Sequence, residues 1–244
     1  MRIDWSSVTN ELALWHSAGL TLPLWWRDDD AISATPDLEQ LIALSKAVNV
    51  PVHLAVIPQM ADAGLAARVA DCENLIPVVH GWAHENHAPK PDKKAEFGAT
   101  RGDVTREIET GMTRLKTLFA GRLKPMFVPP WNRIAPQHYS ALIKAGFSTL
   151  STFTPRTGQD AAACLEQINT HLDPIAWRQG KTLVAPDQLV AQLSQLLADR
   201  RMGVTDNSEP LGLLTHHLVH TPEVWEFSRQ ALLTLQSGPV TIYK

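Results

Sequence analysis

Cysteine is scarce in this chain, which contains only Cys72 and Cys164 among its 244 residues. The two form neither a CxxC pair nor a disulfide-dense pattern, so we expect structural thiols in a reducing compartment. No apolar run approaches the ~20 residues of a membrane span. The N-terminal residues 1–5 also lack the basic and apolar regions of a signal peptide. These absences predict a cytoplasmic protein that has no membrane partner.

An excess of charge of one sign is also missing, because 22 basic and 25 acidic residues leave a formal net charge of -3. No basic cluster stands out along the chain, so we expect no nucleic-acid partner. Hydrophobic residues make up 44% of the sequence, which is enough for one large buried core. We therefore expect a single domain over residues 1–244.

Short apolar runs alternate with segments of helical periodicity along the whole chain. Seven runs read as buried strands, at residues 20–24, 51–58, 74–79, 126–128, 147–151, 172–177 and 211–215. This alternation predicts an α/β fold with a parallel sheet, most economically a closed or nearly closed barrel. The irregular stretches 84–101 and 152–169 are long enough to form loops around a site.

Three adjacent carboxylates, Asp28, Asp29 and Asp30, follow the first apolar run. In α/β folds the carboxyl ends of the strands carry the chemistry, so this is a candidate site. Neighbouring carboxylates repel one another unless a cation or hydrogen-bond donors offset their charge. The same residues could instead cap the helix that begins near Thr35-Pro36, because Asp is a good N-cap.

Three histidines, His80, His84 and His87, close the third apolar run. His80 and His84 are four residues apart and can converge on one metal if the segment turns helically, and Gly81 supplies the freedom to turn. We interpret His87 as a loop residue or a support for the site.

Two later segments add candidate site residues. Two prolines stiffen the backbone before Trp131, whose amide is the first that could be aimed at a reacting oxygen. His216 and His217 must point to opposite sides of an extended strand, so at most one of them faces the barrel mouth.

Taken together, these segments resemble the pattern of the polysaccharide deacetylase superfamily, carbohydrate esterase family four. The matching motifs, in chain order, are Asp29-Asp30, His80-Gly81-Trp82-Ala83-His84, Val128-Pro129-Pro130-Trp131 and Leu214-Thr215-His216. Each motif is weak alone, but their order and spacing make the set fairly specific. The resemblance spans roughly Leu22 to His217 and implies a deformed (β/α) barrel with about seven parallel strands.

The resemblance also implies the roles of individual residues. Asp30, His80 and His84 would hold a divalent metal, most often zinc, for hydrolysis of an N-acetyl group on a sugar. Asp29 would be the general base and His216 the general acid, and the Trp131 N–H would complete the oxyanion site. Asp173 is the candidate partner that orients His216. The residues expected to contact the substrate are Trp26, Trp82, Pro130 and Arg133.

Three departures from the family pattern stand out. Ala31 replaces the glycine that usually follows the aspartate pair, and Gly81 replaces a hydroxyl residue between the histidines. Val128 stands where the family has the arginine that pairs with the base. Arg27 or Arg133 could substitute for that arginine, and otherwise Asp29 would be more basic.

Some alternatives stay open at this point. The matching pair could be Asp28-Asp29, although the small residue after Asp30 favours Asp29-Asp30. Hydrolysis of a small non-sugar amide is a second possible activity. A non-catalytic barrel that binds metal and carbohydrate is a third reading, but a pure binder would not need base, ligands and acid together.

Overall fold

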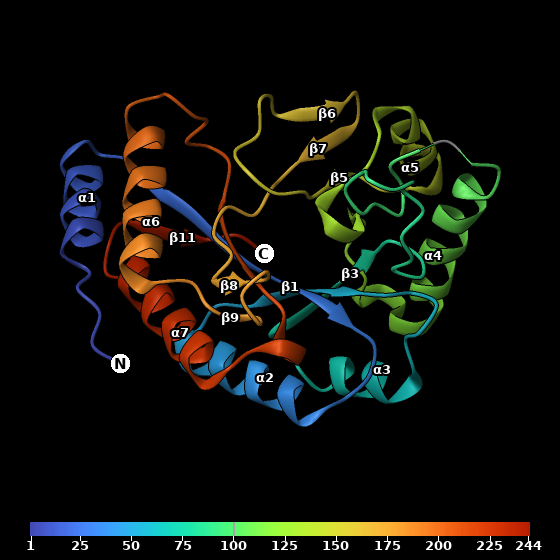
Figure 1. The fold of residues 1–244 in the computed structure, drawn as a ribbon, viewed down its shortest axis with the longest axis horizontal. Coiled ribbons are helices and arrows are strands. Elements are labelled where there is room, and N and C mark those ends of the chain that lie inside the picture. The colour runs from blue at the N-terminus through green and yellow to red at the C-terminus, as the bar shows by residue number, and fades with distance from the viewer. Residues whose placement is uncertain (100) are drawn as a thin grey trace.

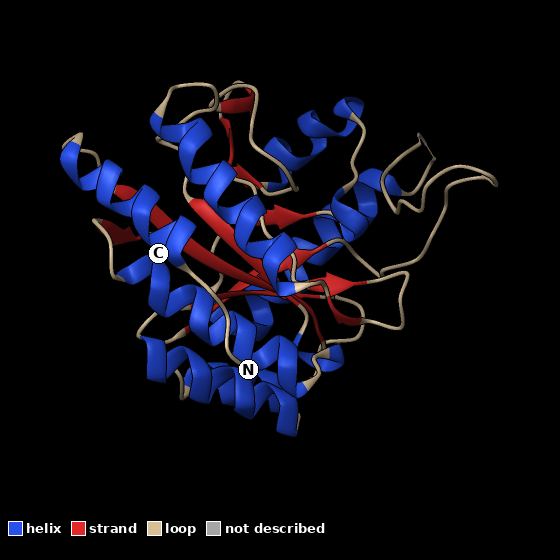
Figure 2. Ribbon diagram, turned by 60° about the vertical axis from the view of Figure 1, so that its left-hand side comes forward, coloured by secondary structure: helices blue, strands red, loops and turns tan. Residues whose placement is uncertain are grey.

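The computed structural model of the chain describes residues 1–99 and 101–244 (Figure 1). Its helices are α1 (Ser6–Ser17), α2 (Pro36–Val48), α3 (Ala63–Ala70), α4 (Val104–Phe119), α5 (Tyr139–Ala145), α6 (Pro186–Arg201) and α7 (Pro222–Gln236). Its strands are β1 (Leu22–Ala31), β2 (Val52–Val56), β3 (Leu75–His80), β4 (Met126–Val128), β5 (Thr149–Leu150), β6 (Asp160–Ala162), β7 (Leu165–Gln167), β8 (Ile175–Ala176), β9 (Thr182–Leu183), β10 (Leu211–Thr215) and β11 (Val240–Ile242). Helices lie around the outside of the strands (Figure 2).

The main sheet is parallel apart from one hairpin and curls into a nearly closed barrel. Its order is β10-β1-β2-β3-β4-β5-β7-β6, with β11 also paired to β1 and only β6 antiparallel. The segment after β7 closes the ring through isolated parallel bridges, Phe153 to Thr170 and Leu172 to Leu213. Seven strand positions therefore surround the core, and the predicted α/β barrel of about seven parallel strands is confirmed.

One expected strand is wrong in its position. Residues 172–177 do not form a barrel strand, because the ring is closed by residues 165–172. β8 pairs instead with β9 in a separate antiparallel hairpin. The stretch 152–169, expected to be irregular, contains the β6–β7 hairpin.

The start of α2 decides how the acidic stretch is used. The Thr35 hydroxyl, and not an aspartate, caps this helix by accepting the Leu38 N–H at 3.1 Å, and Pro36 occupies its first position. The aspartates at the end of β1 are therefore free for another purpose. Among the described residues, no helix has the length and apolar character needed to cross a membrane.

Candidate active site

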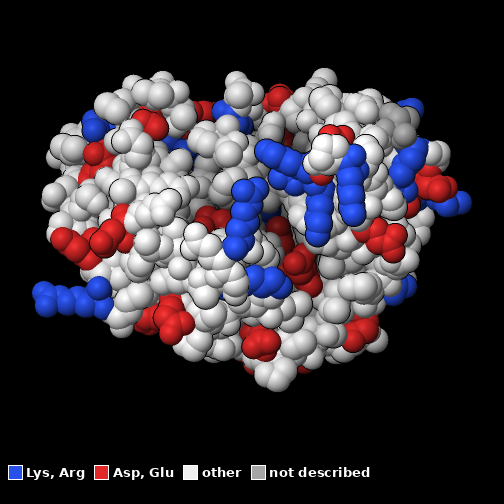
Figure 3. Space-filling view, in the orientation of Figure 1, with Lys and Arg blue, Asp and Glu red and all other residues white. Residues whose placement is uncertain are grey.

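A cleft of about 630 Å³ opens at the carboxyl ends of the barrel strands. Its lining brings together Asp29, Asp30, His80, His84, Trp131, Asn132, Arg133, Phe153, Thr154, Asp173, Ile175, Trp177, Gln192, Leu214 and His216. Figure 3 shows this face hollowed near its centre, with acidic side chains inside the hollow and lysines and arginines along its rim. All of the residues predicted for metal binding and catalysis thus meet in one cavity.

The backbone of β1 explains how two consecutive aspartates face the same cleft. Side chains alternate along a regular strand, so Asp29 and Asp30 would ordinarily point to opposite faces. Here the pairing with β2 shifts between Asp28 and Ala31, and Asp30 has a φ of 74°. Aspartate is one of the few residues that tolerate this left-handed conformation. The irregularity turns Asp30 to the side on which Asp29 already lies.

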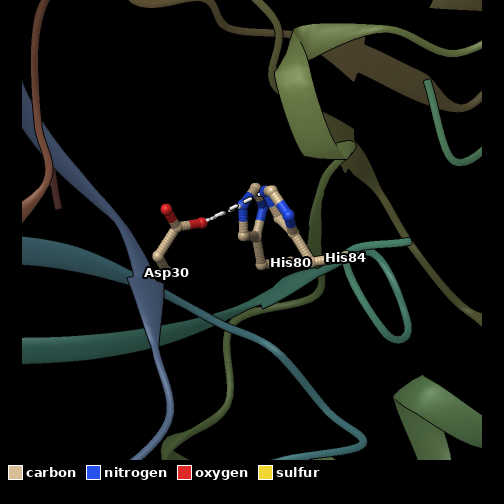
Figure 4. A group of neighbouring side chains, drawn as sticks. All are labelled: Asp30, His80 and His84. Atoms are coloured by element: carbon tan, nitrogen blue, oxygen red, sulfur yellow. Dashed lines mark hydrogen bonds and ion pairs between the residues drawn. The ribbon is translucent and has the colours of Figure 1, made fainter. Parts of the chain in front are cut away.

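Asp30, His80 and His84 form a compact set of ligand atoms. One donor atom from each lies within 4.8 Å of the others, and the three side chains point toward one another (Figure 4). The Nε2 atoms of His80 and His84 lie 3.1 and 3.3 Å from Asp30 Oδ1. His80 Nδ1 donates to the Val128 carbonyl at 2.9 Å, so in the neutral ring the lone pair is on Nε2, facing Asp30. This donor set fits a divalent metal such as zinc.

The electrostatics of these residues favour a cation between them. Burial opposes ionisation of Asp30, but the hydrogen bond from His80 and the nearby histidines bring its pKa below the usual range. Burial also opposes protonation of His80, yet the carboxylates of Asp29 and Asp30 raise the pKa of this imidazole. The lowered pKa keeps Asp30 ionised, and the raised pKa of His80 reflects the negative potential of the two carboxylates, which a bound metal ion would neutralise.

Glu96 holds the turn between the two histidines, a role that the sequence did not suggest. Its carboxylate is buried and accepts the amide N–H groups of Trp82 at 3.2 Å and Ala83 at 2.7 Å. Gly81 has a φ of 59°, and a Cβ placed there would lie 2.3 Å from Glu96 Oε2 and 2.5 Å from Pro130 Cδ. Gly81 is therefore required by both conformation and space, which accounts for the missing hydroxyl residue.

Arg27 supplies the arginine that is absent at Val128. Its Nε and Nη2 donate to the two carboxylate oxygens of Asp29 at 2.9 and 3.1 Å, a bidentate pair in which Arg27 is fully buried. The remaining donors reach Asn132 Oδ1 at 2.6 Å and Ser151 Oγ at 2.7 Å. Arg133, the other candidate, lines the cleft but donates to the Lys94 carbonyl instead.

Trp131 adopts a strained backbone, with φ 56° and ψ 18°, inside the single turn Pro130–Asn132. The next two amides are already bonded, Asn132 N–H to Pro129 O and Arg133 N–H to Pro130 O. The Trp131 ring lies against His84 with centroids 4.4 Å apart. The Trp131 ring is thus placed beside the ligand set, and the role of its amide at the oxyanion site stays a prediction.

His216 and His217 follow the end of β10 at Thr215, and they separate because His217 begins the short helical turn His217–Val219. His216 lines the cleft, and its Nε2 is 4.0 Å from Asp29 Oδ2. His217 is buried, and its Nδ1 donates to Asp28 Oδ1 at 2.5 Å. Only His216 and Asp29 therefore occupy the positions expected of the acid and base, which favours the Asp29-Asp30 register.

Asp173 reaches the cleft but does not bond to His216 within the described part of the chain. Its two oxygens accept the Ile175 N–H at 2.9 Å and the Trp177 indole N–H at 2.8 Å. The Trp177 ring packs edge-on against His216 with centroids 4.6 Å apart. Burial raises the pKa of Asp173, although the nearby His216 opposes that rise. Asp173 therefore acts on the His216 ring through its charge and through the Trp177 ring that it holds, and not through a hydrogen bond.

Three of the expected substrate contacts are wrong. Trp26 is fully buried in the core, where its indole N–H donates to Thr215 Oγ1 at 2.7 Å. Trp82 lines a separate groove between α3 and α4. Pro130 is buried and is not among the residues that line the cleft. Trp177, which is 43% exposed and lines the cleft, was missed because it lies in a hairpin that has no motif.

Comparison with known proteins matches this architecture. No family model matches the sequence, and no curated protein does. A polysaccharide deacetylase structure from Mycobacterium smegmatis superposes with a TM-score of 0.59 at 15% identity, covering 84% of this chain and 72% of that one. A family 4 carbohydrate esterase from Streptomyces lividans, in complex with acetate, superposes with a TM-score of 0.56 at 14% identity, covering 91% and 92%. The chain has the polysaccharide deacetylase fold.

The same fold also occurs without activity. A Bacillus anthracis structure described as a family 4 pseudoenzyme superposes on 91% of this chain and 64% of its own length, with a TM-score of 0.54 at 13% identity. At these identities the likeness concerns the deacetylase fold alone. The activity of this chain has to be argued from its own cleft.

Proposed function

We propose that residues 1–244 form one catalytic barrel domain, a metal-dependent hydrolase that removes an N-acetyl group from a saccharide. The observation that carries the proposal is the convergence, in one cleft, of Asp30, His80 and His84 with Asp29 and His216. A metal site alone would need only the first three. A carboxylate fixed by a bidentate arginine and an imidazole 4.0 Å from it supply the groups for proton transfer.

Asp30 and the Nε2 atoms of the two histidines would hold the metal, which supplies an acidified water and a polarised acetyl carbonyl when bound. Asp29 takes the proton of the attacking water, whose oxygen bonds to the acetyl carbon. The C–N bond breaks, and His216 gives a proton to the departing amine nitrogen. The products are acetate and a free amine, and the Trp131 amide stabilises charge on the acetyl oxygen.

Arg27 keeps Asp29 in place for this step. Its fully buried guanidinium donates to both carboxylate oxygens of Asp29, which leaves this carboxylate little freedom to rotate. Asn132 and Ser151 in turn fix the guanidinium. The base is therefore preorganised, as catalysis of proton transfer requires.

The aromatic walls of the cleft favour a sugar over a small amide. Trp131 and Trp177 both line it, and tryptophan faces pack well on the apolar faces of sugar rings. The non-sugar amide remains the second candidate activity. The cytoplasmic location remains a prediction from the sequence.

Acetate release from a panel of soluble N-acetylated sugars, before and after chelation and with zinc restored, tests the activity. Metal content tests the ligands: we expect about one ion per chain in the wild type, and little in His80→Ala. His16→Ala, at an exposed histidine of α1, is the matched control and should bind metal normally. Metal binding without hydrolysis of any amide would favour the non-catalytic reading.

A further inference from the structure

Asp28 differs from its two neighbours in contributing no atom to the cleft. It is fully buried, yet its carboxylate accepts three hydrogen bonds. The donors are the Thr215 hydroxyl at 2.6 Å, the His217 amide at 3.0 Å and His217 Nδ1 at 2.5 Å. A buried carboxylate is costly unless donors offset its charge, and here every donor comes from one short segment of chain.

That segment is the one that carries His216. Asp28 lies opposite Thr215 in the register of β1 and β10, so its three bonds are to the residues directly before and after His216. The Thr215 hydroxyl oxygen also accepts the Trp26 indole N–H, which directs the hydroxyl proton to Asp28. The carboxylate therefore fixes both flanks of the histidine.

His216 itself has few interactions that would fix it. Its amide donates to His220 Nε2 at 3.2 Å, and its ring rests against Trp177. Its Nδ1 is buried and has no hydrogen-bond partner among the described residues. The direction of the ring consequently depends on the backbone at residues 215–217, because no acceptor holds Nδ1 in the way usual for a catalytic imidazole.

We infer that Asp28 is a positioning residue that places His216 within reach of the departing amine by holding Thr215 and His217. This inference rests on the proposed function, in which His216 protonates that amine. β1 then serves the reaction on both of its faces. Asp29 and Asp30 act in the cleft, while Asp28 anchors the opposite strand from behind.

The inference predicts a dependence on the leaving group. Displacing a catalytic group by about 1 Å can cost on the order of 10²-fold in rate. Departure of an amine needs a proton, whereas the phenolate of an aryl ester leaves without one. Loss of correctly placed His216 should therefore slow amide hydrolysis much more than ester hydrolysis.

The test compares an N-acetyl sugar that the enzyme hydrolyses with 4-nitrophenyl acetate as substrates of the metal-loaded full chain. For Asp28→Asn we expect kcat on the amide to fall on the order of 10²-fold, with KM, metal content and ester turnover close to wild type. Thr215→Val removes one donor and no charge, so it should show a smaller loss of the same kind. It also keeps the test available if Asp28→Asn folds poorly. Ser228→Ala, at a buried hydroxyl in α7, is the matched control and should change neither rate.

His216→Ala tests the proposed role of His216 as the acid separately from the positioning role of Asp28. If it loses amide turnover and keeps ester turnover, the proposed acid is supported, and Asp28→Asn must show the same selectivity. Equal losses on both substrates in Asp28→Asn and Thr215→Val, or no loss in either variant, would then overturn the positioning role alone. If His216→Ala shows no selectivity, His216 is not the acid, and the inference fails together with that part of the proposed function.

Discussion

The two ends of β10 both bury charged side chains, but they use them differently. Glu209, just before the strand, accepts the amides of Arg156 and Asn169 and the His171 Nε2–H, with Arg200 3.5 Å away. None of these residues lines the cleft. At the other end, buried Asp28 accepts a hydrogen bond from Thr215 at the end of the strand, while His216 keeps its Nε2 directed toward Asp29.

The difference shows what distinguishes a structural cluster from a reactive one. Around Glu209 the carboxylate is surrounded by donors from its own chain, so no face remains for a ligand. At the carboxyl end, Asp30 is about one-third exposed and His84 one-quarter exposed at the side chain. A metal or a substrate can still reach these side chains, because they are only partly buried and lie where the strand ends converge.

The largest expected effect is a loss of turnover at the carboxyl end of β10, in the cleft. Asp29→Asn keeps the size of the side chain but removes the base, so kcat should fall ~10²–10⁴-fold. Metal content should change little, whereas the free energy of unfolding should fall by about 3–5 kcal/mol, because Arg27 loses its buried carboxylate partner. Acetate release per folded molecule measures kcat, elemental analysis measures metal content, and urea unfolding measures the loss of stability. Wild-type turnover in this variant would exclude Asp29 as the base.

The second expected effect is a loss of stability at the amino end of β10. Glu209→Gln leaves Arg200 buried without its carboxylate, and breaking such a pair typically costs about 3–5 kcal/mol of stability. Urea unfolding measures the loss, while kcat per folded molecule should stay at the wild-type value. A variant that is fully stable but slow would show that this end also takes part in catalysis.

Much of the fold and the site followed from the sequence for one reason. The carboxyl ends of parallel strands meet at one edge, so motifs that follow such strands are brought together whatever the details of packing. That reasoning placed Asp30, His80, His84 and His216 in one cleft, although their roles remain predictions. It could not choose between Arg27 and Arg133, because that choice depends on where the chain after β4 directs Arg133.

Other partners were not predictable because they depend on register. Asp28 meets His217 across 189 positions of sequence, and Glu96 reaches the amides of residues 82 and 83 from within a long loop. Neither contact has a sequence motif. The closing strand was misplaced for a similar reason, since residues 165–172 join the ring through short or isolated pairings.

The third prediction sharpens the role of the turn that carries His84. Gly81→Ala introduces a Cβ at a positive φ and within 2.5 Å of Pro130, so the turn must shift. Disturbing a support of metal ligands typically costs 10–100-fold in metal affinity. Competition with a zinc chelator measures that loss. Gly102→Ala, where a Cβ would meet nothing within 4 Å, is the matched control. Equal affinities in the two variants would contradict the argument.

The smallest expected effect is a difference between the two ends of β10 in how the free energy of unfolding depends on pH. Burial lowers the pKa of His171 from 6.5 to about 4, so the folded chain holds this ring neutral where the unfolded chain protonates it. The stability it contributes is complete above pH 6.5 and is lost as pH falls toward 4, by about 1.4 kcal/mol per pH unit at most. The lowered pKa of Asp28, by contrast, acts below its unfolded value of 3.8. Between pH 4 and 6.5, the free energy of unfolding of His171→Gln should therefore fall less steeply than that of the wild type. Identical slopes in urea titrations would mean that His171 is not held neutral in the fold.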